Sequence, residues 1–138
     1  MPHFFTTQIY YEDTDHSGVV YHANYLKFFE RAREHMFGIP ALVDLYQQQG
    51  IGFVVYQAHM NFKKGAEFGD QIIIESAVTK ESLYRLIFHQ QAWKITKNTS
   101  EKELLVDAHI HLACVNNQKK LVPLPQTVLQ KLEIQNFL

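Results

Sequence analysis

The residues best suited to chemistry lie close together near the N-terminus, between Tyr10 and Tyr25. They are three carboxylates, two histidines and a glycine, namely Glu12, Asp13, Asp15, His16, His22 and Gly18. A carboxylate can attack a carbonyl carbon or deprotonate a water, and a histidine can move protons near neutral pH. The same residue types are common in turns and helix caps, so the pattern alone favours a structural role for Asp13 and Asp15.

The segment that follows has the pattern of an amphipathic helix from Asn24 to Phe37. Its apolar residues recur at i, i+3, i+4, i+7 and i+11 from Tyr25, and Gly38 and Pro40 supply a stop. The chemical residues therefore precede a helix N-terminus, where free backbone N–H groups and the helix dipole attract negative charge. An oxyanion formed from an attacked carbonyl is such a charge, so a carboxylate and an oxyanion donor can meet at this turn. Asn24 is expected to cap the helix.

The rest of the chain is expected to form strands around that helix. Two-residue alternation predicts strands at 4–11, 54–63, 72–80, 83–97 and 103–116, with a second helix at 41–49. On the second of these strands, Val54, Tyr56, Ala58, Met60 and Phe62 are expected to share one face. A short helix after Pro125 would turn Val128, Leu129 and Leu132 inward.

This order of elements predicts one α+β domain, residues 1–138, in which a long helix lies on a five-stranded antiparallel sheet. Because one helix covers only part of such a sheet, we expect a homo-oligomer formed through the sheet.

Composition and charge exclude several classes of function. The chain is 46% hydrophobic and 13% aromatic, and its formal net charge is -1. A nucleic-acid partner is not expected, because binding a phosphate backbone requires a basic surface. Cys114 is the only cysteine and falls on an apolar strand face, so we expect it in the core. The N-terminus lacks the pattern of a signal peptide and no apolar run reaches about 20 residues, so a cytoplasmic protein is expected.

The loop and the start of the helix resemble a family signature. They read Asp13-Thr14-Asp15-x-x-Gly18-Val19-Val20-Tyr21-His22-x-x-Tyr25, followed by Phe28-Phe29-Glu30-x-Ala32. This sequence resembles the 4-hydroxybenzoyl-CoA thioesterase family of the hotdog superfamily, and its form is most similar to the acyl-CoA thioesterases associated with the bacterial Tol-Pal envelope system. The resemblance is strong over residues 8–35 and weaker over 62–75. It implies a hotdog fold, a long central helix wrapped by the sheet, in dimers or tetramers.

The resemblance also implies an activity, the hydrolysis of acyl-CoA to a free acid and CoA in lipid metabolism. Asp15 matches the catalytic carboxylate, acting as nucleophile or general base, and the oxyanion donor would be a backbone N–H near His22. His22 and Tyr11 match two further active-site residues. Gly18, Val19 and Tyr21 are the expected substrate contacts of the loop. Lys63 and Lys64 are candidates for the CoA phosphates, although a solvated basic turn has the same pattern. No metal or cofactor is required.

Three alternatives remain open on the sequence alone. One is a non-catalytic acyl-CoA-binding or scaffold protein with lipid-synthesis or envelope-associated partners. A second is a metal hydrolase whose ligands are Asp13, Asp15, His16 and His22. Third, His109 and His111 lie two residues apart on a predicted strand and could bind zinc, but the sequence offers no clear third ligand, which favours an ordinary exposed strand face.

Overall fold

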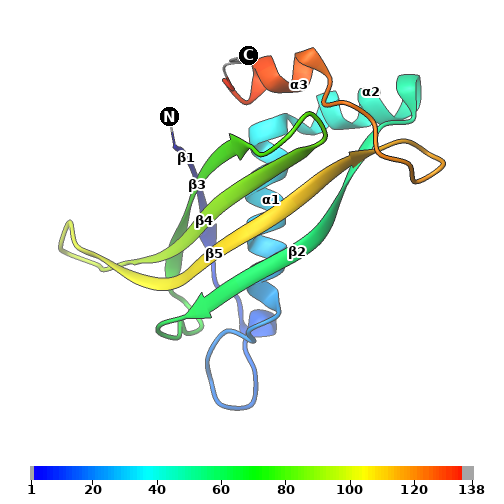
Figure 1. The fold of residues 1–138 in the computed structure, drawn as a ribbon. Coiled ribbons are helices and arrows are strands. Elements are labelled where there is room, and N and C mark those ends of the chain that lie inside the picture. Colours follow the sequence, from blue (N-terminus) through cyan, green and yellow to red (C-terminus); the bar gives the residue numbers. More distant parts are fainter. Residues whose placement is uncertain (1, 135–138) are drawn as a thin grey trace.

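The computed structural model describes residues 2–134, which form a five-stranded sheet and three α-helices (Figure 1). The strands are β1 (His3–Gln8), β2 (Gly52–Phe62), β3 (Gln71–Lys80), β4 (Arg85–Ile95) and β5 (Lys102–Val115). The helices are α1 (Asn24–Phe37), α2 (Ile39–Gln49) and α3 (Gln126–Lys131), and a 3-10 turn covers Tyr11–Asp13. The sheet order is β1-β3-β4-β5-β2, with all neighbours antiparallel. The α+β prediction is confirmed, and α1 has the predicted bounds.

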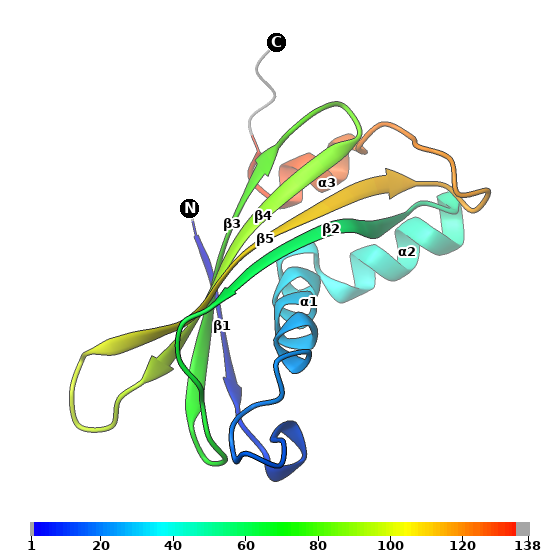
Figure 2. The same cartoon turned by 60° about the horizontal axis from the view of Figure 1, so that its bottom comes forward.

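Helix α1 lies in the hollow of the curved sheet, as Figure 2 shows. Its predicted apolar stripe is buried: Tyr25, Phe28, Phe29 and Ala32 are each exposed by 2% or less, and Met36 is partly buried. The sheet residues in the same core cluster include Ile72, Ile74, Phe88, Ala108 and Ile110. Burying each large apolar side chain contributes about 1.5–3 kcal/mol, so this contact fixes α1 and the loop before it on the sheet.

A buried polar network also ties α1 to the sheet. Gln90 of β4 donates from Nε2 to the carbonyl of Phe29 (3.0 Å) and to Oγ of Ser76 (2.9 Å). Its Oε1 accepts a hydrogen bond from Nη1 of Arg33 (3.0 Å). Arg33, Ser76 and Gln90 are the buried polar residues among those described. Because buried polar groups are costly when unpaired, this network fixes one register of α1 on the sheet.

Strand β2 forms one edge of the sheet, and its register with β5 shifts between Val55 and Gln57. Val55 lies opposite Leu112 and Ala58 opposite Ile110, so both face α1. The extra residue at the shift reverses the alternation of side chains before it. The prediction that Val54 and Tyr56 share a face with Ala58 is therefore wrong.

The ends of the chain differ little from the prediction. β1 ends at Gln8, before the predicted end at Tyr11, because the chain turns there into the 3-10 turn. Helix α3 buries the three residues predicted to face inward, Val128, Leu129 and Leu132. None of the helices formed by residues 2–134 has the length and apolar character needed to span a bilayer.

Candidate active site

A cleft of about 280 Å³ opens at the N-terminal end of α1. Its lining comes from the loop before α1, the start of α1, and the end of β2 with the turn that follows. The lining residues are Asp15, Val19, Val20, His22, Tyr25, Phe62, Lys63, Lys64 and Gly65. The fold thus brings together five of the predicted site residues from two distant parts of the sequence.

The loop is held against the turn after β2 by backbone contacts. The N–H of Val20 donates to the carbonyl of Ala66 (2.8 Å), and Val19 forms an isolated bridge with Glu67. A Cβ on Gly65 would lie 2.9 Å from Cγ1 of Val19, so the close approach requires glycine. At the tip, Gly18 has φ +88°, which disfavours a side chain for conformational reasons.

Asp13 shapes the loop through contacts of its side chain and its carbonyl. Its Oδ2 accepts from the N–H of Tyr10 (2.8 Å), and its carbonyl accepts from the N–H of Tyr21 (2.9 Å) and from Nδ2 of Asn24 (2.9 Å). Asn24 is the first residue of α1, and the cap position is taken by Ala23. The prediction that Asn24 caps the helix is therefore wrong; its side chain fastens the loop instead.

Asp15 lies in the loop, and one of its carboxylate oxygens accepts two hydrogen bonds. The hydroxyl and the N–H of Ser17 donate to its Oδ1 at 2.7 and 2.9 Å. No hydrogen bond within residues 2–134 ends on Oδ2. The hydroxyl of Ser17 is the main cause that holds the pKa of the Asp15 carboxyl below its usual value, and the Ser17 N–H adds to it. The backbone N–H of Val19 also favours the charged form, and the side chain is therefore an ionised carboxylate at neutral pH.

His22 lies just before α1, on the same cleft as Asp15. Its ring contacts Tyr21 at 4.6 Å between centroids and Phe62, edge-on, at 6.1 Å. Within residues 2–134, the backbone N–H groups of His22 and Ala23 have no acceptor. These free donors at a helix start are what an oxyanion requires.

The two lysines of the cleft differ in their partners. Nζ of Lys64 forms an ion pair with Glu103 (3.1 Å). Lys63 is exposed, and within the described part of the chain its ammonium group has no such pair. Of the two lysines, Lys63 is thus the one whose charge is not paired with a carboxylate in the described part of the chain.

Two predicted tyrosines do not line this cleft. Tyr11 is 76% exposed in the 3-10 turn and packs edge-on against Phe68 at 5.8 Å between centroids. Tyr21 supports the ring of His22 without lining the cleft itself. The single chain therefore gives Tyr11 no contact with Asp15 or His22.

Tyr25 and Phe62 line the cleft, although their pattern predicted only core and strand roles. The Tyr25 side chain is buried, its hydroxyl makes no hydrogen bond of good geometry, and burial raises its pKa to about 12. The phenol is therefore neutral at physiological pH, and its hydroxyl is buried although the residue lines the cleft. The helical spacing that identifies a core position cannot show that the same residue also lines a cleft.

The loop does not assemble a metal site within residues 2–134. Asp13, Asp15, His16 and His22 do not converge as ligands, and the one group of possible ligands found in that range lies elsewhere, on the sheet. Cys114 is fully buried, and burial raises the pKa of its thiol to about 11. Cys114 is thus a core residue, as predicted.

The sequence profile of the Thioesterase-like superfamily matches residues 10–132. The chain belongs to this superfamily. It is 35% identical over 127 residues to the acyl-CoA thioesterase YbgC of Haemophilus influenzae, covering 90% of this chain and 89% of the relative. It is 33% identical over 128 residues to the acyl-CoA thioester hydrolase YbgC of Escherichia coli O6:H1, covering 88% and 89%.

Two solved structures share the fold of this chain. A 1,4-dihydroxy-2-naphthoyl-CoA thioesterase from Synechocystis superposes with a TM-score of 0.84 at 23% identity, covering 96% of each chain. A mutant 4-hydroxybenzoyl-CoA thioesterase in complex with 4-hydroxybenzoyl-CoA gives a TM-score of 0.86 at 17% identity, covering 94% of this chain and 97% of that one. The predicted hotdog fold is confirmed.

Proposed function

We propose that this protein hydrolyses acyl-CoA thioesters to a free acid and CoA at the cleft between Asp15 and the start of α1. The observation that carries the proposal is the shared cleft: Asp15, an ionised carboxylate, and His22, whose backbone N–H has no acceptor within residues 2–134, line one cavity. The chain also resembles, over nearly its whole length, two relatives named for this activity.

Asp15 supplies the reactive oxygen in either of two ways. As a nucleophile it would attack the thioester carbonyl and release CoA, and water would then cleave the mixed anhydride. As a general base it would take a proton from the attacking water. Both routes need an ionised carboxylate, and the hydrogen bonds from Ser17 favour that form. In both routes the carbonyl oxygen of the thioester becomes negatively charged, and the N–H groups at the start of α1 would stabilise that charge.

The cationic end of the cleft fits the CoA moiety. Lys63 lies beside the turn after β2, on the cleft wall opposite the loop, and its charge is available for a phosphate. The ring of His22, held between Tyr21 and Phe62, would orient the thioester or transfer a proton to the leaving thiolate. No metal or organic cofactor takes part in these steps.

A dimer through β2 would complete the site. β2 is an edge strand with exposed apolar side chains, including Val54 (46%), Val55 (47%) and Phe62 (50%). A two-fold antiparallel pairing would bring the Phe62 end of β2, with its cleft, beside the Gly52 end of the second copy. At the Gly52 end each chain has a second cavity of about 270 Å³, lined mainly by apolar residues from α1, α2, β2 and β5. The acyl group would enter this space, and dimers could pair further into tetramers.

We propose the cytoplasm as the setting of the reaction. The role in lipid metabolism and the lipid-synthesis or envelope-associated partners are predictions from the resemblance alone.

The proposed activity is tested by measuring free thiol release from short-chain, long-chain and aromatic acyl-CoAs, with the affinity for CoA measured in parallel. We expect turnover of at least one class of substrate. Retained CoA affinity without turnover of any substrate would contradict hydrolysis and favour a non-catalytic acyl-CoA-binding protein.

A further inference from the structure

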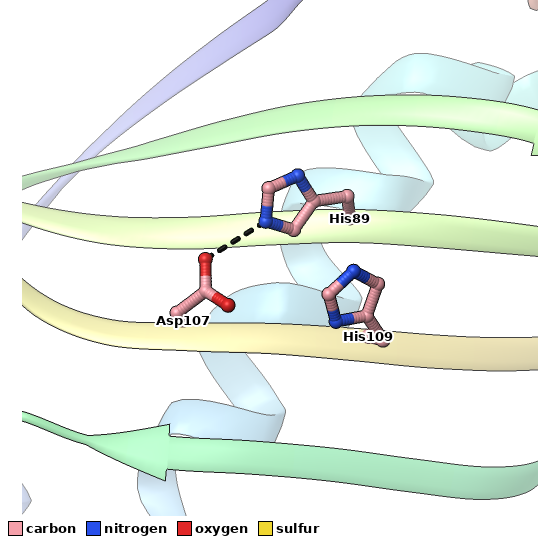
Figure 3. Close-up of side chains that lie close together, drawn as sticks. All are labelled: His89, Asp107 and His109. Atoms are coloured by element: carbon pink, nitrogen blue, oxygen red, sulfur yellow. Dashed lines mark hydrogen bonds and ion pairs between the residues drawn. The ribbon is translucent and has the colours of Figure 1, made fainter.

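The outer face of the sheet carries a second cluster of chemically active side chains, away from the cleft. Along β4 and β5, residues that face α1 are buried, including Phe88, Gln90, Val106, Ala108 and Ile110. Because side chains alternate along a strand, His89, Asp107 and His109 project from the opposite side. Figure 3 shows the three side chains together on β4 and β5, with α1 behind the sheet.

The strand register places these residues next to one another. His89 and His109 are direct partners across the β4–β5 pair. Their rings stack at 4.6 Å between centroids with 9° between planes. Nε2 of His89 lies 2.8 Å from Oδ1 of Asp107, and one ligand atom from each of the three residues lies within 4.8 Å of the others.

An ordinary ion pair accounts for only part of this arrangement. His89 and Asp107 satisfy each other, and Nε2 of Gln91 donates to the same Oδ1 of Asp107 at 2.9 Å, which fixes the carboxylate. His109, in contrast, makes no hydrogen bond or ion pair within residues 2–134, although it stands against His89. A second imidazole without a partner, beside a bonded imidazole and carboxylate, is the composition of a metal-ligand set.

His111 does not take part in this cluster. Its Nδ1 lies 3.9 Å from Glu81, and its ring packs against Tyr56. His109 and His111, although two residues apart in the sequence, therefore contact different residues. The further ligands that the sequence did not show for His109 are His89, on β4, and Asp107, two residues before His109 on β5.

We propose that His89, Asp107 and His109 bind a divalent transition-metal ion, with Zn²⁺ the expected one. Two imidazoles and one carboxylate suit Zn²⁺ and its borderline neighbours Co²⁺, Ni²⁺ and Cu²⁺ better than Mg²⁺ or Ca²⁺. Zinc bonds of about 2.0–2.1 Å in a tetrahedron place ligand atoms roughly 3.3 Å apart. Nε2 of His89 and Oδ1 of Asp107 lie 2.8 Å apart, closer than this spacing, so the ion would replace the hydrogen bond between them, and small rotations of both histidine side chains would complete the set. A water would fill the fourth position, or His59 of β2, which lies directly opposite His109 in the strand register, and the ion would link β4 to β5 on the outer face.

The test is zinc titration by calorimetry on tag-free protein that has been treated with a chelator and dialysed. Wild type should bind one Zn²⁺ per chain. His89→Gln and His109→Gln should each weaken binding by at least about tenfold. His111→Gln is the matched control on the same strand and face, and it should bind as wild type does. Zinc should also raise the melting temperature of wild type and of the control, but not of the two variants.

The opposite results would overturn the proposal. One is no binding by wild type at about 100 micromolar zinc, which would exclude a dissociation constant below that concentration. The other is equal binding by wild type and both ligand variants. Far-UV circular dichroism checks that each variant keeps its sheet, and Asp107→Asn provides a third variant that retains the size of the side chain but lacks its charge.

Discussion

At the scale of single residues, the ionisation of Asp15 depends mainly on Ser17. The two hydrogen bonds from Ser17 favour the carboxylate form and hold the pKa of Asp15 below its usual value. A lowered pKa means that the charged form persists to lower pH. Activity that needs this charge is therefore lost only as the pH falls through the lowered pKa.

Replacing Ser17 by alanine should raise the pKa of Asp15 toward that of a free aspartate, because the strongest hydrogen bond to the carboxylate disappears. NMR titration of the Asp15 side-chain carboxyl carbon measures this pKa directly. The acid limb of kcat/KM that Asp15 causes should move to higher pH in the same variant. An unchanged Asp15 pKa would show that Ser17 does not control its charge.

The two lysines of the cleft should differ in their effect on substrate affinity. Lys63→Ala should raise KM for acyl-CoA about 3- to 10-fold, because it removes a cation free to bind phosphate. Lys64→Ala is the matched variant, and it should change KM less because Lys64 is already paired with Glu103. Steady-state kinetics on one acyl-CoA gives both values. Equal effects, or a larger effect at Lys64, would count against this assignment.

At the scale of elements, most of the fold was predictable because hydrophobic periodicity reports which face is buried. The spacing from Tyr25 to Met36 predicted α1 with its bounds. Periodicity cannot show an inserted residue, so the register shift between Val55 and Gln57 was missed and Val54 was assigned to the wrong face. Local rules also misplaced Asn24, because its amide bonds to the loop rather than to the helix that it begins.

The contact between α1 and β4 should depend on Gln90. Gln90→Leu leaves the buried guanidinium of Arg33 without its hydrogen-bond acceptor, and should lower the free energy of unfolding by about 2–4 kcal/mol. Gln91→Leu, the next residue but on the outer face, should cost less than about 1.5 kcal/mol. Urea denaturation at matched protein concentration measures both. Equal losses would mean that the buried network does not stabilise the contact.

At the scale of the whole molecule, the sequence predicted three residues that the structure brings to one cleft, but not the other residues that line it. The motif pointed to Asp15 and His22, and the basic turn pointed to Lys63. That Tyr25 reaches the cleft, and that His89 stands beside His109, depends on tertiary packing and on the cross-strand register. Neither can be read from a single strand or helix, because the partners are set by the pairing of distant segments.

Self-association should depend on the open edge of β2. Replacing both Val54 and Val55 by lysine would place like charges along the paired edge and should weaken the dimer by at least about tenfold. Leu121→Lys is the control, since Leu121 is similarly exposed (47%) and lies outside β2. Sedimentation over a concentration series measures the dissociation constants. A dimer that is unaffected by the β2 variant would place the interface elsewhere.

The central claim, that the Asp15 carboxylate performs the chemistry, is tested most directly by the rate of CoA thiol release in Asp15→Asn. Asp44→Asn, on the exposed surface of α2, is the control for the loss of one charge. We expect a fall in kcat of about 10²- to 10⁴-fold for Asp15→Asn, with the oligomer and the fold unchanged, and wild-type turnover for Asp44→Asn. Wild-type turnover by a folded Asp15→Asn protein would contradict the claim.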